Sequence, residues 1–201
     1  MNRTSGSPLS SSGAHLLRCF LVFCMMALCA DVYGSDRFWI ASSPADWNNT
    51  ANWSTSSGGA GGASIPGSSD SVIFNSSGTG NCNVNANIDV YAINVTSGYS
   101  GSIALGAYSI NTAGAGTATF AGGSFSGGNG TITFAGTTTL SGTAFTATSG
   151  TMEIKKAYTF SGGSFSHNNG RVKFSSSSFT ITGSQTFYQL EFFAGAFQWN
   201  T

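Results

Sequence analysis

The amino-acid sequence predicts an all-β protein, a right-handed parallel β-helix in which each coil of the solenoid takes about 20 residues. Three observations support this fold: a 20-residue repeat between 117 and 174, alternation of apolar and polar side chains, and glycine-rich corners. An antiparallel β-sandwich joined by Asn-Gly hairpins is the alternative. It fits less well, because runs of three or four residues are short for a sandwich and the repeat spacing is strict.

Composition narrows the class of protein before any motif is considered. The chain of 201 residues has 28 glycines and 16 phenylalanines, and its seven basic and seven acidic side chains make only 7% of it charged. Without a basic excess to neutralise phosphates, we do not expect a nucleic-acid binder. The 13% aromatic content argues against disorder. One ordered, β-rich domain with an uncharged polar surface remains.

Residues 1–34 are predicted to be a secretory signal peptide. Arg3 and Arg18 precede an uncharged apolar run of twelve residues that ends at Ala30. This run is shorter than the roughly 20 residues of a membrane-spanning helix, so we expect no membrane span after cleavage. Cleavage after Gly34, with Val32 two positions earlier, fits the small-residue rule better than cleavage after Ala30. An uncleaved anchor and a lipoprotein modified at Cys29 are the alternatives to this secreted or cell-surface location.

The cysteines predict no internal disulfide. Three of the four lie in the predicted signal peptide, and Cys82 alone remains in the mature chain. We expect Cys82 to be a small buried apolar residue, with a reactive thiol or an intermolecular bridge as the alternative.

The segment 35–74 is predicted to cap the first coil. Trp39, Trp47 and Trp53 form the densest aromatic cluster of the chain. We interpret them as a hydrophobic cap, and the functional alternative is a glycan-stacking platform made by the same three rings. Asp70 precedes an apolar run and is expected to accept hydrogen bonds at a turn.

Residues 75–201 are predicted to form the coils, and the regular 20-residue units cover 117–192. Upstream of these units the predicted strands, which suggest wider coils, are 72–74, 82–84, 88–95 and 102–110. The last unit has no polar cap after it, so we expect a truncated C-terminus or a continuation onto another chain. A short frayed tail is the alternative.

Each regular unit holds three short strand-like runs. In the first unit these are 117–120, 124–126 and 131–134. Phe125, Phe145 and Phe165 share one phase of the repeat, and every charged side chain falls on the opposite parity to the large aliphatic ones. Equivalent side chains should therefore stack from coil to coil about 4.8 Å apart. Columns of buried phenylalanine should then be the main source of stability.

The corners of the coils carry residues that adopt unusual backbone angles at low cost. Asn129, Ser149 and Asn169 each precede a glycine, and Asn and Gly reach positive φ more easily than other residues. We expect these three side chains to form a ladder that satisfies backbone groups at the bend.

Several motifs follow a recognisable order along the mature chain. WNNTANWS runs from Trp47 to Ser54, PGSSDSVIF from Pro66 to Phe74, and GSQTFYQLEF over 183–192. This pattern resembles secreted bacterial surface proteins of the autotransporter-like or pectin-lyase-like parallel β-helix kind. The resemblance implies a surface-exposed structural, adhesive or carbohydrate-associated protein, with extracellular polysaccharide or cell-surface components as partners. It implies no particular activity, because one fold hosts many functions.

Titratable side chains are too scattered to predict a catalytic site. Between Val90 and Met152 the sequence has no Asp, Glu, Lys, Arg or His. A glycoside hydrolase needs two carboxylates roughly 5–9 Å apart, and no two acids share a phase of the repeat. Glu153 instead has Lys173 in its phase, which predicts a surface ion pair between coils. We therefore expect no enzyme, no catalytic residue and no cofactor.

His167 is the single histidine of the mature chain and lies in a Ser-His-Asn-Asn-Gly corner. No other metal-ligating side chain shares its phase, so we expect an exposed corner residue and no metal site.

One repeated feature suggests a binding surface. The predicted threonine array comprises Thr117, Thr119, Thr137, Thr139 and Thr159, and its main column continues near Thr180. Flat threonine arrays on β-solenoids order water in some ice-binding proteins. The simpler interpretation is that threonine favours strands and tolerates solvent, and Ala157 interrupts the second column.

These features predict a secreted or cell-surface, non-enzymatic β-solenoid module with a structural or adhesive role. The alternatives are a carbohydrate-active β-helix protein that binds or cleaves polysaccharide, and an ice-binding solenoid.

Overall fold

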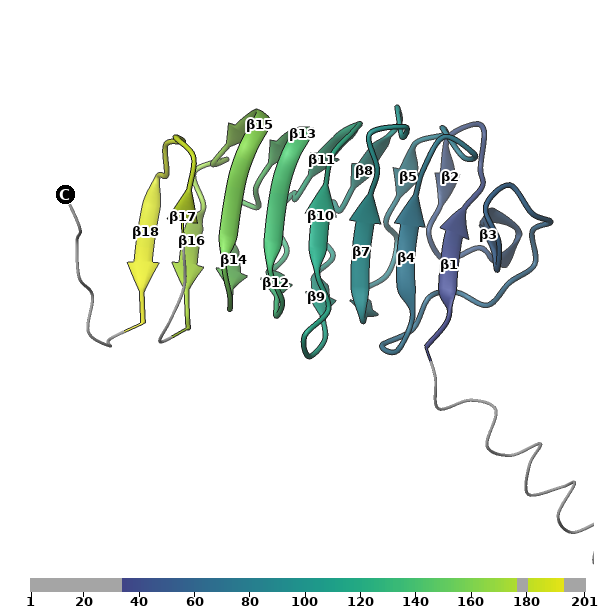
Figure 1. Ribbon diagram of the computed structural model, residues 1–201, viewed down its shortest axis with the longest axis horizontal. Coiled ribbons are helices and arrows are strands. Elements are labelled where there is room, and N and C mark those ends of the chain that lie inside the picture. Colours follow the sequence, from purple (N-terminus) through teal and green to yellow (C-terminus); the bar gives the residue numbers. More distant parts are fainter. Residues whose placement is uncertain (1–33, 177–180, 194–201) are drawn as a thin grey trace, which may run out of the picture. The chain divides into compact units, whose positions relative to one another are not determined.

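Short runs of alternating apolar and polar side chains form β-strands, and the chain turns between them at Gly, Asn and Ser corners. The computed structural model describes residues 34–176 and 181–193. The strands stack into a parallel β-solenoid of about six turns, with coils of about 21 residues (Figure 1). Most of the predicted signal peptide, 1–33, and the C-terminal residues 194–201 lie outside the described part.

The strands of the coils form three walls. The first wall contains β1 (Asp36–Trp39), β4 (Ser71–Phe74), β7 (Ala92–Val95), β10 (Ala118–Phe120), the first parts of β13 (Thr138–Thr146) and β15 (Tyr158–Ser166), and β17 (Ile181–Thr182). The second wall contains β2 (Ala45–Asp46), β5 (Cys82–Asn83), β8 (Ser102–Ala104), β11 (Ser124–Ser126) and the last parts of β13 and β15. The third wall contains β6 (Ile88–Val90), β9 (Ile110–Thr112), β12 (Ile132–Phe134), β14 (Thr151–Ile154), β16 (Arg171–Phe174) and β18 (Gln189–Phe192).

The strand pairings distinguish between the two predicted folds. The first two walls form one 12-stranded sheet, joined through β13 and β15, and the third wall is a 6-stranded sheet. Among the described strands, only β3 (Trp53–Ser54), which follows a short 3-10 helix over Thr50–Asn52, pairs antiparallel, with β1. The parallel solenoid is thus confirmed, and the antiparallel sandwich is wrong. No helix in the described ranges is long and apolar enough to span a bilayer.

The phenylalanine column is the clearest sign of stacking in register. Phe125 pairs with Phe145, and Phe145 pairs with Phe165, in parallel strands of successive coils. The first two rings are 4.7 Å apart and 11° from parallel, and the next two are 6.1 Å apart at 7°. Phe145 is fully buried between its neighbours. The predicted phase of the 20-residue repeat is therefore confirmed.

The inward-facing side chains form apolar columns that fill the solenoid. One column on the third wall runs through Ile88, Ile110, Ile132, Met152, Val172 and Leu190. Burying a large apolar side chain contributes roughly 1.5–3 kcal/mol before the entropy of ordering it is subtracted. These columns hold consecutive coils together, because each side chain contacts its equivalents above and below.

The segment predicted as one strand over 88–95 is two strands with a corner at Tyr91. Val90 and Ile93 are both buried, whereas strict alternation would place one of them outside. This shift of parity marks the bend between β6 and β7, and the Tyr91 N–H donates to the carbonyl of Asp70 at 2.9 Å. The segment 102–110 likewise contains β8 and the first residue of β9.

The corner between the second and third walls is closed one residue earlier than predicted. Thr148 and Asn168, rather than Ser149 and Asn169, donate side-chain hydrogen bonds to the carbonyl of Gly128, at 3.4 and 3.1 Å. Thr148 Oγ1 also accepts from the N–H of Gly150 at 3.0 Å. The predicted ladder is wrong in position because the buried Thr148 side chain, and not the exposed one after it, faces the backbone of the bend.

Cys82 lies in the core of the second wall and is fully buried, as predicted for a small apolar residue. Burial raises the pKa of its thiol, and the negative charge of Asp46 raises it further. The reactive thiolate is therefore disfavoured at Cys82.

Candidate functional site

The outer face of the first wall carries uncharged side chains in register. We call these side chains, from β4 to β17, the threonine face. Its main column runs through Ile73, Asn94, Thr119, Thr139, Thr159 and Thr182. Thr180, where the sequence predicted the column to continue, lies outside the described residues, and Thr182 occupies the position next to Thr159.

A second column lies two residues earlier on the same face. It contains Ser71, Ala92, Thr117, Thr137 and Ala157, aligned by the backbone hydrogen bonds of consecutive coils. Thr117 and Thr137 are exposed, whereas Thr119, Thr139 and Thr159 of the main column are half-buried between their neighbours, and Thr182 is exposed. The structure therefore brings the predicted threonine array together on one surface, with the predicted interruption at Ala157.

The threonine face has the geometry of a regular array of hydroxyl groups. Equivalent residues in adjacent coils are about 4.8 Å apart, and alternate residues along a strand are about 6.7 Å apart. Within the described residues of the two columns no side chain is charged, and none of the array hydroxyls bonds to another protein group. Each hydroxyl can donate one hydrogen bond and accept others. The surface is thus able to match a neutral, repeating, hydroxylated ligand or an ordered layer of water.

The three predicted glycan-stacking tryptophans lie in the core of the first coil. Trp39 and Trp53 have no exposed surface and Trp47 is 2% exposed. The ring of Trp53 packs edge-on against Trp39 at 5.2 Å and Trp47 at 4.7 Å, and its Nε1–H donates to the carbonyl of Trp47 at 2.8 Å. These contacts support the hydrophobic-cap interpretation. They leave no ring face on which a sugar could stack, because the rings cover each other and Phe74.

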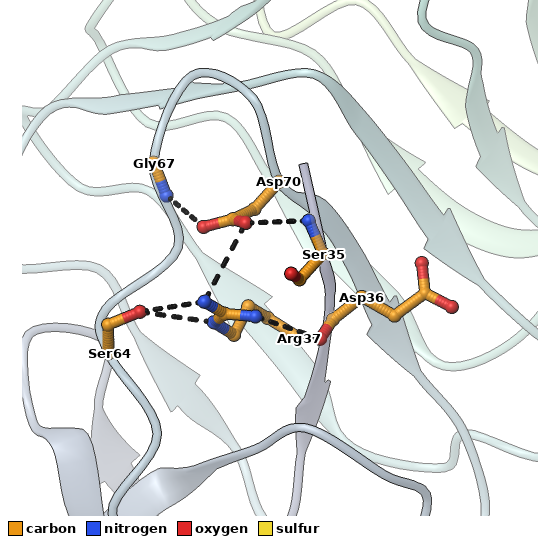
Figure 2. Close-up of polar contacts among 6 residues, drawn as sticks. All are labelled: Ser35, Asp36, Arg37, Ser64, Gly67 and Asp70. Carbon is orange, nitrogen blue, oxygen red and sulfur yellow. Dashed lines mark hydrogen bonds and ion pairs between the residues drawn. The ribbon is translucent and has the colours of Figure 1, made fainter. Parts of the chain in front are cut away.

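Arg37 is the residue that the sequence analysis missed in this region. It pairs with Val72 and so takes an inward position, where the next three coils have buried apolar side chains. Ser64 Oγ accepts hydrogen bonds from Arg37 Nε at 3.2 Å and from Nη2 at 2.9 Å (Figure 2). The sequence could have indicated this position, because Arg37 lies two residues before the buried Trp39 in one strand and alternate residues of a strand face the same side.

Asp70 is the partner that makes the inward position of Arg37 possible. Its Oδ1 lies 3.7 Å from Arg37 Nη2 and accepts from the Ser35 N–H at 3.0 Å, and its Oδ2 accepts from the Gly67 N–H at 2.9 Å (Figure 2). The carboxylate therefore satisfies two backbone donors and one cation at once. The predicted turn role of Asp70 is confirmed, and the pair fastens the loop before β4 to the first strand.

Charged side chains gather on the outer face of the third wall. Glu153 lies 3.8 Å from Lys173, which confirms the predicted ion pair between coils, and 3.7 Å from Lys155. Glu191 continues the ladder, 3.7 Å from Lys173 and 2.9 Å from Arg171. Such partly exposed pairs contribute at most about 1 kcal/mol each. We assign them to structure, because alternating charges in adjacent coils neutralise one another.

The carboxylate of Glu153 has a further partner on its own wall. Ser175 Oγ donates a hydrogen bond to Glu153 Oε1. This hydrogen bond, followed by the charges of Lys155 and Lys173, lowers the pKa of Glu153. A lowered pKa keeps this side chain ionised, which suits an ion pair and opposes a role as a catalytic acid.

His167 is half-buried rather than exposed, because its ring stacks on Tyr188 of the next coil with ring centres 5.6 Å apart. Its Nδ1 accepts from the Asn169 N–H at 2.9 Å, which stabilises the corner. Across 34–176 and 181–193, no group of three or more His, Cys, Asp or Glu side chains could hold a metal ion.

In comparisons with known proteins, no family model, no curated protein and no solved structure matches this chain. Within the described residues, the threonine face is regular and uncharged and its array hydroxyls make no hydrogen bonds to the protein, whereas Glu153, Lys173, Arg171 and Glu191 of the third wall pair with one another.

Proposed function

We propose that this chain is a secreted or cell-surface β-solenoid module with a structural or adhesive role, and that its threonine face contacts neutral extracellular polysaccharide. The observation that carries the proposal is the register of Thr119, Thr139 and Thr159 in adjacent coils, in columns whose described side chains from β4 to β17 carry no charge. The signal-like N-terminus and the motif resemblance support the location.

Neutral polysaccharide suits this surface for two physical reasons. Hydroxyl groups on the ligand can exchange hydrogen bonds with hydroxyl and amide groups on the protein, without removing an ion from water. A polymer of identical sugar units is also periodic, as is a surface that repeats every coil. Many weak contacts of one kind then act together.

The arrangement of charged groups supports a non-enzymatic role. Asp70 satisfies two backbone donors and Arg37, and Glu153 lies between Ser175 and two lysines. Asp89 Oδ1 accepts from Asn111 Nδ2 at 2.8 Å on the outer face of the third wall. Each of these carboxylates stabilises a neighbouring strand or loop.

Ice binding is a second candidate, because the same register places threonines in a regular array. Thr159 pairs with both Thr139 and Thr182, so the main column extends over four coils from Thr119. The methyl and hydroxyl groups of such an array can hold ordered water. Inhibition of ice recrystallisation by the purified protein would distinguish this role from binding to polysaccharide.

The test uses two threonines of one strand. Thr139 and Thr146 both belong to β13 and are both half-buried, but Thr139 lies on the threonine face and Thr146 on the second wall. We expect Thr139→Tyr to lower retention on insoluble cellulose or chitin about tenfold, and Thr146→Tyr to leave it unchanged. Equal effects of the two variants, or no retention of the wild type on any neutral polysaccharide, would contradict the proposal. Ice activity lost only in Thr139→Tyr would favour the second candidate.

A further inference from the structure

The N-terminal boundary of the solenoid meets a buried carboxylate. The compact unit that contains the solenoid begins at Gly34. The next residue, Ser35, donates its backbone N–H to Asp70 Oδ1 at 3.0 Å (Figure 2). The carbonyl of Ser35 accepts from the Ser71 N–H at 3.1 Å. Ser35 is thus the first described residue that hydrogen bonds tie to the fold.

We propose that the chain is processed between Gly34 and Ser35, and that the new α-ammonium group of Ser35 binds the carboxylate of Asp70. Processing would replace an amide hydrogen bond by an ion pair at the same nitrogen, and so complete the N-terminal cap. The inference rests on the proposed secretion of the protein.

The covalent step is hydrolysis of one peptide bond by the leader peptidase of the secreting cell. Water adds its hydroxyl to the carbonyl carbon of Gly34 and a proton to the nitrogen of Ser35, so that a carboxylic acid and an amine form. The amine takes up a proton at neutral pH. Gly34 and Val32 fit the small-residue pattern that such peptidases require before the cleaved bond.

The site around Asp70 is suited to an ammonium group. The nitrogen of Ser35 already lies at hydrogen-bond distance, so cleavage requires no movement of this atom. Asp70 is 8% exposed, and a charge-assisted hydrogen bond there is stronger than a neutral one. Arg37 also faces the carboxylate, but Ser64 Oγ and the carbonyl of Asp36 accept hydrogen bonds from its guanidinium and hold it in place.

A substitution at Gly34 distinguishes cleavage of the Gly34–Ser35 peptide bond from cleavage after Ala30. A Cβ atom on residue 34 would lie 1.5 Å from the carbonyl oxygen of Ser69, so a chain that keeps this residue accommodates only glycine. A leader peptidase, by contrast, accepts alanine in front of the cleaved bond. With processing after residue 34, wild type and Gly34→Ala yield the same mature molecule.

The first experiment expresses the full chain with its own leader in a secreting bacterial host. We expect the exported wild type and Gly34→Ala to begin at Ser35 by N-terminal sequencing and intact mass, with identical Tm values. An exported product that begins at Asp31, with a lower Tm for Gly34→Ala, would overturn the inference and leave secretion intact. A product that keeps its leader would contradict the proposed secretion itself.

The second experiment tests whether the α-ammonium binds Asp70. We expect the α-amine of the mature protein to be acylated about tenfold faster in Asp70→Asn than in wild type, because the ion pair withholds the reactive neutral amine. Asp36→Asn is the matched control, since this neighbouring carboxylate is exposed and points away from Arg37 (Figure 2). The acylation rate of the wild-type α-amine can also be compared between the folded protein in buffer and the unfolded protein in urea, which requires no variant. Equal acylation rates in both comparisons would overturn the docking of Ser35.

Discussion

The first and the last described coils use the same strand geometry but differ in what covers them. In the first coil, Trp39 and Trp53 have no exposed surface, and the loop before β4 is fastened by Arg37 and Asp70. In the last described coil, Leu190 of β18 is 41% exposed, although it pairs with Val172, which is 1% exposed. The comparison shows that equivalent inward positions of one column differ in burial from coil to coil.

The largest expected effect is at the covered end. Trp53→Ala removes the ring that contacts Trp39, Trp47 and Phe74, and we expect it to lower the free energy of unfolding by about 3–5 kcal/mol. Urea denaturation followed by tryptophan fluorescence and circular dichroism would measure the change. Tyr188→Ala, at a side chain 58% exposed, is the control and should change stability by less than about 1 kcal/mol.

The sharpest comparison lies within one column. Ile110 and Leu190 both belong to the inward column of the third wall, but Ile110 is 1% exposed. We expect Ile110→Ala to cost about 3 kcal/mol and Leu190→Ala less than about 1 kcal/mol, because the exposed side chain leaves no closed cavity. Similar losses of stability for the two variants would show that the last coil is covered in solution.

The polar fastening of the first coil should have a smaller effect. Asp70→Ala leaves the Gly67 and Ser35 N–H groups without their acceptor and removes the carboxylate that faces the half-buried Arg37, and we expect a loss of about 2 kcal/mol. Asp36→Ala, at an exposed carboxylate of the same strand, should change the urea midpoint little. A midpoint for Asp70→Ala that equals wild type would show that the loop is held by the tryptophans alone.

The smallest expected effect depends on pH. The pKa of Glu153 is lower in the folded chain than in the unfolded chain, so at pH values in this range the folded state binds fewer protons than the unfolded state. Its contribution to stability is therefore present above the ordinary pKa of glutamate, about 4.3, and is lost as pH falls through the folded-state pKa. We expect Glu153→Gln to cost less than about 1 kcal/mol at pH 7, and less still at pH 3. A cost that stays constant between these pH values would contradict the assigned ion pairs.

The regular coils were predictable because their contacts depend on sequence spacing alone. Residues 20 apart become neighbours in a stack, so the phases of Phe125, Phe145 and Phe165, and of Glu153 and Lys173, predicted real contacts. The same reasoning placed the threonine array on one face. Corner geometry was predicted less well, because alternation alone does not say which of two adjacent polar side chains, Thr148 or Ser149, turns toward the backbone.

The sequence by itself determined the repeat, the parity of each strand and the columns that fill the solenoid, because these follow from local geometry repeated along the chain. Only the tertiary structure decided which residues surround the segment 35–74, which lies outside the repeat. It buried the tryptophans that could have formed a sugar platform, paired the inward Arg37 with Asp70, and placed the Ser35 nitrogen against the same carboxylate. Those contacts join residues that no period relates, so only the folded chain brings them together.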